Sequence, residues 1–271
     1  MNQLYDAYKN FFEIVIADTP ELKNEVYSIR YQVLCTEERI PGFDQSLYPD
    51  KLEKDTYDSH STHALLKHRS TGKFIGTVRL VLPDPENSDK PFPVEAYTQL
   101  DAEFFSKNNI SRQNTVEISR FLVIKEFQRR KGDCYFQQAK QNEANTHDSN
   151  LDGTAIKKER RTSINITLIL MAAVVQMSAQ HDVKNWLSFM NPSLNRLLCF
   201  SGLDFIPIGP LVECHGLRQP YFVKNIDVLD RIYSDNHDVW EILTDQGRYI
   251  PSHIHSYEKN PLSRASAPKN K

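Results

Sequence analysis

The chain has 271 residues, and its 33 Lys and Arg against 35 Asp and Glu set a formal net charge of −2. Hydrophobic residues make up 39% and charged residues 25%, which is ordinary globular usage and excludes a disordered chain. The near-neutral charge excludes a generally basic protein that coats nucleic acid. The 9 Gly against 14 Pro argue against a glycine-rich dinucleotide-binding fold.

Cysteine spacing and hydropathy favour a soluble protein of a reducing compartment. The cysteines form no C-x-x-C pair, so the sequence predicts neither a zinc knuckle nor a disulfide framework. The N-terminus lacks a basic segment followed by an apolar run, so we expect no signal peptide. Residues 164–177 are the most apolar stretch, but they are too short and too interrupted to span a bilayer. We therefore expect a cytoplasmic location. The cysteines are Cys35, Cys134, Cys199 and Cys214.

Local patterns in the first half of the chain predict helices and strands in alternation. Thr19, Pro20 and Glu21 form a helix start, with a cap residue, an early Pro and an acid in the first turn. Residues 36–60 form a long polar loop, which in a compact domain is usually functional or disordered. Expected helices cover residues 4–12, 18–35 and 98–107, and expected strands cover residues 12–17, 62–68, 73–82 and 115–124.

The second half continues the alternation after a polar segment. Expected helices cover residues 163–180, 191–200 and 227–243, and expected strands cover residues 186–190, 205–212 and 221–223. This order predicts one α/β (α+β) domain over residues 1–256, with a central mixed, mostly antiparallel sheet flanked by helices. We expect a flexible polar insertion at about residues 137–161 and a disordered basic tail at residues 257–271.

A basic turn with one glycine follows the strand predicted at residues 115–124. It contains Arg129, Arg130, Lys131 and Gly132, with Cys134 two residues further on. Free N–H groups at a helix N-terminus bind phosphate well. The spacing resembles the pyrophosphate-binding loop of the GNAT acyltransferase superfamily, from which Cys134 departs. The alternative is a solvated basic turn.

Charged residues in several segments form a second, more specific pattern. It resembles the N-acyl-homoserine-lactone synthases, with an Arg in the first helix, E-x-D-x-x-D, a G-x-x-R strand and an E-x-S-R-F strand. Those synthases have a GNAT-type fold. The aromatic residues that they place downstream of the first Arg are absent, and Leu34 and Ile40 stand near those positions. The matching residues are Arg30, Glu53, Asp55, Asp58, Arg79, Glu117, Ser119, Arg120 and Phe121.

The stretch from Arg30 to Pro83 carries a nearly literal match to two related families. It resembles the N-acyl amino acid synthases and the acyltransferases associated with PEP-CTERM/exosortase systems, and motifs within residues 191–210 continue the resemblance. The resemblance implies a GNAT-fold N-acyltransferase. Such an enzyme moves a medium or long acyl chain from an acyl carrier protein or acyl-CoA thioester to the amine of an amino acid or similar small molecule. It implies an acyl thioester as co-substrate and no permanently bound cofactor.

Chemistry indicates roles for the matching residues. Glu117 stands in an apolar strand, where burial raises a carboxyl pKa, so it is the candidate general base. Ser119 shares its face of the strand and would orient the amine or a water. Alternatively, Glu117 pairs with Arg79 or Arg120 and only holds the strands.

The charges of three acids and three arginines would cancel if these side chains meet. Pairing of this kind gives the lowest free-energy cost for burying them. Such a network would pin the loop of residues 36–60 and shape the acceptor pocket, and one of its arginines could hold a substrate carboxylate. A divalent cation on the acids is the alternative, which the arginines disfavour. For His60 and His63 we expect structural roles. The network residues are Arg30, Glu53, Asp55, Asp58, Arg79 and Arg120.

Basic clusters lie at the two ends of the polar segment at residues 132–156. Their positive charge suits an encounter with an acidic acyl carrier protein. The apolar helix at residues 164–175 and the strand at residues 186–190 would line an acyl tunnel or simply form core. Three other functions remain open: an acyl-homoserine-lactone synthase using S-adenosylmethionine, a non-catalytic acyl- or carrier-protein-binding module, and a metal-dependent hydrolase. The second basic cluster is Lys157, Lys158, Arg160 and Arg161.

Overall fold

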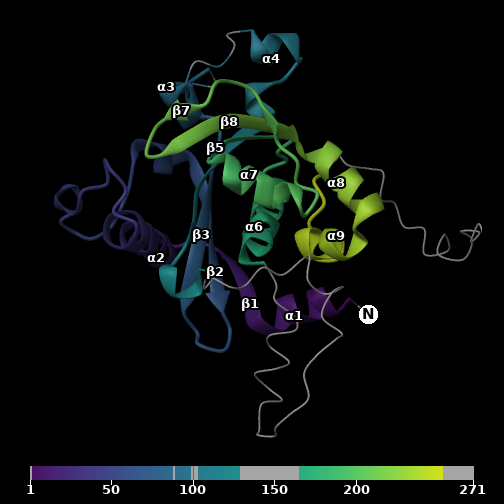
Figure 1. The fold of residues 1–271 in the computed structure, drawn as a ribbon, viewed down its shortest axis with the longest axis horizontal. Helices are drawn as coiled ribbons and strands as arrows, with labels where there is room; N and C mark the ends of the chain where they lie inside the picture. Colours follow the sequence, from purple (N-terminus) through teal and green to yellow (C-terminus); the bar gives the residue numbers. More distant parts are fainter. Residues whose placement is uncertain (1, 88, 99, 101–102, 129–164, 253–271) are drawn as a thin grey trace, which may run out of the picture.

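The computed structural model describes residues 2–87, 89–98, 100, 103–128 and 165–252 (Figure 1). Several predictions lie outside the described residues: the basic turn Arg129, Arg130, Lys131 and Gly132, the polar insertion at residues 137–161, the second basic cluster and the tail at residues 257–271.

The chain begins with α1 (Gln3–Phe11), β1 (Phe12–Ile16) and α2 (Pro20–Tyr31). The Thr19 hydroxyl accepts the N–H of Leu22, and Pro20 occupies the first turn of α2, so this helix starts as its sequence predicts. Its end passes directly into a π-helical turn, Gln32–Glu37. That turn lies at the start of the predicted polar loop, which also holds two short 3₁₀ turns, Gln45–Leu47 and Thr56–His60.

One sheet forms the centre of the molecule, with strand order β1-β2-β3-β4-β5-β8-β6. Neighbouring strands are antiparallel except β4 and β5, which are parallel, so the predicted mixed, mostly antiparallel sheet is confirmed. A short strand, β7 (Val212–Glu213), pairs with the outer part of β8. The other strands are β2 (Ser61–His68), β3 (Phe74–Val81), β4 (Thr115–Val123), β5 (Asn185–Met190), β6 (Ile206–Pro207) and β8 (Leu217–Lys224).

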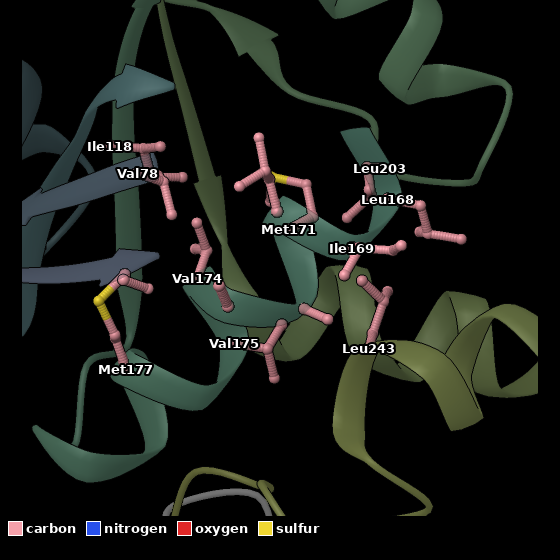
Figure 2. Close-up of a cluster of buried hydrophobic side chains, with 14 of the residues drawn as sticks. Val78, Ile118, Leu168, Ile169, Met171, Val174, Val175, Met177, Leu203 and Leu243 are labelled. Atoms are coloured by element: carbon pink, nitrogen blue, oxygen red, sulfur yellow. The ribbon is translucent and has the colours of Figure 1, made fainter. Parts of the chain in front are cut away.

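The core lies between the sheet and α6 (Ile166–Gln180), which is apolar on nearly every side and buried accordingly. This helix packs on β2 and β3 and, on its other side, on α9 (His237–Thr244). Figure 2 shows Val174 of α6 facing Val78 of β3, while Leu243 of α9 lies on the opposite side of the helix. No helix in the described ranges has the length and apolar character needed to cross a membrane.

The remaining helices are shorter than α6. They are α3 (Pro93–Tyr97), α4 (Phe104–Lys107), α7 (Pro192–Cys199) and α8 (Asn225–Asp235). The first helix, α1, packs on α9, and the Tyr5 hydroxyl donates to Asp245 at 2.6 Å. The first and last described elements are therefore joined.

Two predicted elements are wrong. The helix expected at residues 98–107 is replaced by α3 and α4, because Pro93 in the first turn and a Glu95 side chain that accepts the Phe92 N–H start a helix five residues earlier. The strand expected at residues 205–212 is two separate pairs of residues, β6 and β7. Pro207 and Pro210 supply no backbone N–H for a continuous ladder there. The strand expected at residues 221–223 extends to the whole of β8.

Candidate active site

The two central strands separate halfway along their length. Parallel pairing joins Thr115–Ile118 of β4 to Asn185–Ser188 of β5 and then stops, so Ser119 and Phe189 have no pairing across this gap. On its other edge β4 bulges, because Thr77 pairs with Leu122 while Arg79 pairs with Ser119. Arg120 lies in this bulge with a φ of 49°. A bulge of this kind bends its strand and redirects side chains, and here it turns β4 away from β5.

A cavity of about 330 Å³ opens where the strands part. One end of its lining is polar and carries side chains of β3, β4 and β8. The walls are mainly apolar and come from the π-helical turn, α6, α7 and the segments that follow them. The polar lining includes Arg79, Glu117, Ser119, Arg120, Ser188, Asn191, His215 and Arg218, and the apolar lining includes Leu34, Ile40, Phe43, Phe121, Met171, Met190, Leu194, Leu198 and Phe205.

Glu117 is a carboxyl group buried at this polar end, with 3% of its surface exposed. Burial raises its pKa to about 7, although the N–H of Val94 and the charges of Arg79 and Arg120 act in the opposite direction. Its Oε2 accepts the Val94 N–H at 2.7 Å. Within the described chain no Lys, Arg or His lies within 4 Å of this carboxyl group, so it forms no ion pair with Arg79 or Arg120.

Ser119 lies two residues along β4 on the same face as Glu117, as the alternation of a strand requires. Its Oγ accepts a hydrogen bond of 2.9 Å from Nε of Arg79, the residue opposite it on β3. Both side chains line the cavity. The structure therefore places Ser119 between the buried carboxyl group and the charged residues behind it.

The three predicted acids and three predicted arginines meet in one network. Asp58 accepts from Nη1 of Arg30 at 2.7 Å and from Nη1 of Arg79 at 2.8 Å. Asp55 accepts from Arg79 at 2.6 Å and from Arg120 at 3.0 Å. Glu53 accepts from Nη2 of Arg120 at 2.8 Å and also from Nε of Arg30. The network joins α2, the loop after the π-helical turn, β3 and β4.

Arginine partners keep two buried carboxylates of this network charged. Burial alone would raise the pKa of Glu53 and of Asp58, but hydrogen bonds and charge from their arginine partners hold both pKa values below the usual range. Asp55 and Asp58 also form a capping box, in which Asp58 accepts the Asp55 N–H at 2.8 Å. The carboxylates face guanidinium groups, and no cluster suited to a metal ion occurs in the part of the chain that the structure describes.

The two histidines lie on either side of the network. His63, on β2 beside Arg79, is fully buried, and Nε2 lies 3.7 Å from Oδ1 of Asp58. Burial lowers the pKa of His63 to about 3, so the ring is neutral at physiological pH. His60 lies 3.9 Å from Asp84, away from the cavity.

Sequence reasoning missed the segments that close the cavity. The turn between β7 and β8 places His215 against Phe43, with ring centroids 5.2 Å apart, and the His215 ring also contacts the Pro41 carbonyl. Tyr97 of α3 stacks on Phe189 of β5 at 6.1 Å. These partners are more than ninety residues apart along the chain, and no local pattern links them.

Comparison with protein families identifies a domain that supplies part of the lining of this cavity. Residues 29–138 match the acetyltransferase (GNAT) domain model. This matched segment, which is less than half of the chain, is that of a GNAT acetyltransferase domain, and it supports an acyltransferase. The match runs from the end of α2 through β4, so it contains the six network residues together with Glu117 and Ser119. The predicted enzyme class and GNAT fold are confirmed. No curated protein matches the sequence.

Solved structures share this GNAT fold at low sequence identity. The CoA-dependent acyl-homoserine lactone synthase MesI is 14% identical, with a TM-score of 0.50, over 86% of this chain and 93% of MesI. The AHL synthase LasI is 17% identical, with a TM-score of 0.47, over 79% of this chain and 89% of LasI. FeeM, an N-acyl amino acid synthase from uncultured soil microbes, is 9% identical, with a TM-score of 0.44, over 81% and 94%.

Proposed function

We propose that this GNAT domain transfers a medium or long acyl chain from a thioester to the amine of an amino acid or similar small molecule. The donor is acyl-CoA or an acyl carrier protein, and the amine attacks directly in a ternary complex. The observation that carries this proposal is Glu117, a buried carboxyl group with a pKa of about 7 at the polar end of a largely apolar cavity. General bases are most effective when their pKa lies near the operating pH.

Glu117 takes the proton that the amine must lose. An ammonium group has no free electron pair, so amide formation requires this deprotonation, directly or through a water. The neutral amine nitrogen attacks the carbonyl carbon, the C–N bond forms, and the C–S bond breaks as the thiol leaves with a proton. Ser119, on the same face of β4, orients the amine or the water.

The gap between β4 and β5 suits the donor. Beyond Ile118 and Ser188 the facing edges of the two strands make no ladder to each other, so their backbone groups are available to an extended chain of amides. A pantetheine arm is such a chain. The apolar wall formed by α6 and α7 receives the acyl group, whose burial contributes about 0.8 kcal/mol per methylene. Arg129, Arg130, Lys131 and Gly132 remain the proposed phosphate-binding turn, and the basic clusters remain the proposed contact for an acyl carrier protein.

The charged network supports the acceptor pocket. Arg79 and Arg120 line the cavity, and their guanidinium groups already bind Asp55, Asp58 and Glu53. The network therefore fixes the loop of residues 36–60 against β3 and β4, and it gives the pocket a rigid, charged wall. This proposal retains Arg30, Glu53, Asp55, Asp58, Arg79 and Arg120 as pocket-forming residues.

We further propose that residues 1–256 form one domain that acts in the cytoplasm. The contact of α1 with α9 and the continuous sheet from β1 to β8 support a single unit. The association with an exosortase system remains a prediction from resemblance, and the neighbourhood of the gene would test it.

A second candidate is an acyl-homoserine-lactone synthase that uses S-adenosylmethionine. The fold shared with MesI favours it. Leu34 and Ile40, which stand where those synthases carry aromatic residues, line the cavity, and neither position supplies a ring that could stack on an adenine. Release of methylthioadenosine by the purified protein would decide for this candidate.

Mass spectrometry of lipid extracts tests the first proposal. Cells expressing the intact chain are compared with cells expressing Glu117→Gln and Ser119→Ala. A new N-acyl amino acid from the intact chain, lost with Glu117→Gln and reduced with Ser119→Ala, supports it. Purified protein offered acyl-CoA and acyl carrier protein thioesters then distinguishes the donors. No acylated amine with either donor and a full panel of amino acids would contradict the proposal and favour a non-catalytic acyl-binding module.

A further inference from the structure

One arginine of the cavity has no carboxylate partner. Arg218, at the start of β8, is half-buried and lines the cavity together with Glu117 and Ser119. Its Nη1 donates to the carbonyl of Phe189 at 3.3 Å, and in the described residues no Asp or Glu lies within salt-bridge distance of it. An arginine guanidinium carries five N–H donors, so most of its hydrogen-bonding capacity is unused.

Among the described residues, Arg218 is the arginine of the cavity lining that forms no ion pair, and Glu117 is the carboxyl group of that lining that forms none. Three carboxylates neutralise Arg30, Arg79 and Arg120. Burial lowers the pKa of Arg218, the Cys214 thiol acts in the opposite direction, and the positive charge of Arg120 acts in the same direction as burial. A partly desolvated guanidinium beside another cation is costly unless an anion accompanies it. The cavity therefore has a place for one negatively charged group at Arg218.

We propose that Arg218 binds the carboxylate of the acceptor and selects amines that carry one. This inference rests on the proposed function and names a residue for its acceptor specificity. The planar guanidinium matches a carboxylate in a two-bond arrangement, which fixes orientation as well as position. In an α-amino acid one carbon joins the amine to the carboxylate. Anchoring the carboxylate at Arg218 thus keeps the amine in the cavity that Glu117 also lines.

A phosphate of the donor is the other anion of suitable chemistry. On a phosphopantetheine arm the phosphate lies at the opposite end from the thioester sulfur, whereas Arg218 and Glu117 line one cavity of about 330 Å³. The group bound by Arg218 therefore belongs to the molecule that reacts beside Glu117. The sequence-based hypothesis placed a substrate carboxylate on an arginine of the charged network, but those arginines are already paired.

Paired acceptors test the assignment. Each amino acid that the intact protein acylates is compared with its decarboxylated amine, and kcat/KM is measured for both. Arg218→Gln should lower the ratio of amino acid to amine by about 10- to 100-fold, mainly through a higher KM for the amino acid. Arg218→Lys keeps the charge and should restore part of the ratio. Arg196→Gln, an exposed arginine of α7 outside the cavity, is the matched control.

Three outcomes would overturn the assignment. The ratio could stay at the value of the intact protein in Arg218→Gln, both acceptors could lose activity equally, or KM could rise for the acyl donor alone. The last result would place the donor phosphate at Arg218.

A binding measurement separates this inference from the proposed function. Calorimetry compares an N-dodecanoyl amino acid with its primary amide, which lacks the negative charge. Tighter binding of the acid that disappears in Arg218→Gln supports the anion site even if no acyl transfer is found. Equal binding of both compounds by the intact protein would contradict the anion site, whatever the activity.

Discussion

The carboxyl group of Glu117 on β4 accepts a hydrogen bond of 2.7 Å from the backbone N–H of Val94, in the first turn of α3. That turn is itself held in place. Glu95 accepts the Phe92 N–H at 2.7 Å and forms two hydrogen bonds with Arg112, at 2.8 and 2.5 Å. One oxygen of Glu117 is thus directed toward α3, and a rigid element outside the strand fixes the orientation of the carboxyl group.

Activity should depend on pH through Glu117. Burial raises its pKa to about 7, and a general base works in its deprotonated form, so kcat/KM should rise with pH and level off above about 7. Glu117→Gln should lower kcat/KM by about 10²- to 10⁴-fold and remove this limb of the profile. Steady-state kinetics from pH 5 to 9 measures it. An unchanged profile in the variant would remove Glu117 from the role of base.

The free energy of unfolding should also depend on pH through Glu117, and this can be measured without any substrate. Because the pKa is higher in the folded state than the ordinary 4.5, the intact protein loses stability as pH rises from about 4.5 through about 7. Glu117→Gln carries no titrating group there, so its stability relative to the intact protein should increase over this range by up to about 3 kcal/mol. Urea unfolding at pH 5 and pH 8 provides the comparison, and a constant difference would contradict the raised pKa.

Loss of one carboxylate from the charged network should strongly destabilise the folded protein. Asp58→Asn leaves Arg30 and Arg79 buried without one of their carboxylates, which should cost about 3–5 kcal/mol in the free energy of unfolding. Asp50→Asn, in an exposed pair with Lys54, is the control and should leave the free energy of unfolding nearly unchanged. Chemical denaturation of both variants measures this. Equal losses would show that the network is not a buried unit.

Acyl length should respond to the apolar wall. Leu194 of α7 lines the cavity, and Leu194→Trp should fill part of it and shift the preferred chain toward fewer carbons. Each methylene that no longer fits should lower relative kcat/KM about fourfold, from the roughly 0.8 kcal/mol of its burial. Leu47→Trp is the control, because Leu47 is 62% exposed. Competition among acyl-CoA thioesters of different length, followed by mass spectrometry, gives the preference. An unchanged preference would place the acyl chain elsewhere.

Much of the sheet was predictable because its strands carry their own patterns. The hairpin of β2 and β3 and the start of α2 follow local turn and cap chemistry, which needs no distant partner. The short elements around the cavity were not predictable. The start of α3 depends on Pro93 and on the Glu95 side chain, which accepts the Phe92 N–H, and β6 and β7 exist only through pairing with β8. Isolated two-residue strands have no periodicity to detect.

Local sequence patterns were enough to predict most of the long helices and strands, the charged residues of the network and the position of Glu117 and Ser119 on one face of a strand. Those features depend on neighbours along the chain and on the alternation of side chains. The separation of β4 and β5 after Ile118 and the orientation of Glu117 by α3 follow from packing between distant segments. Packing also leaves Arg218 without a carboxylate partner among the described residues. Pairing, burial and charge balance arise between residues far apart in the chain, so they exist only once the sheet has formed.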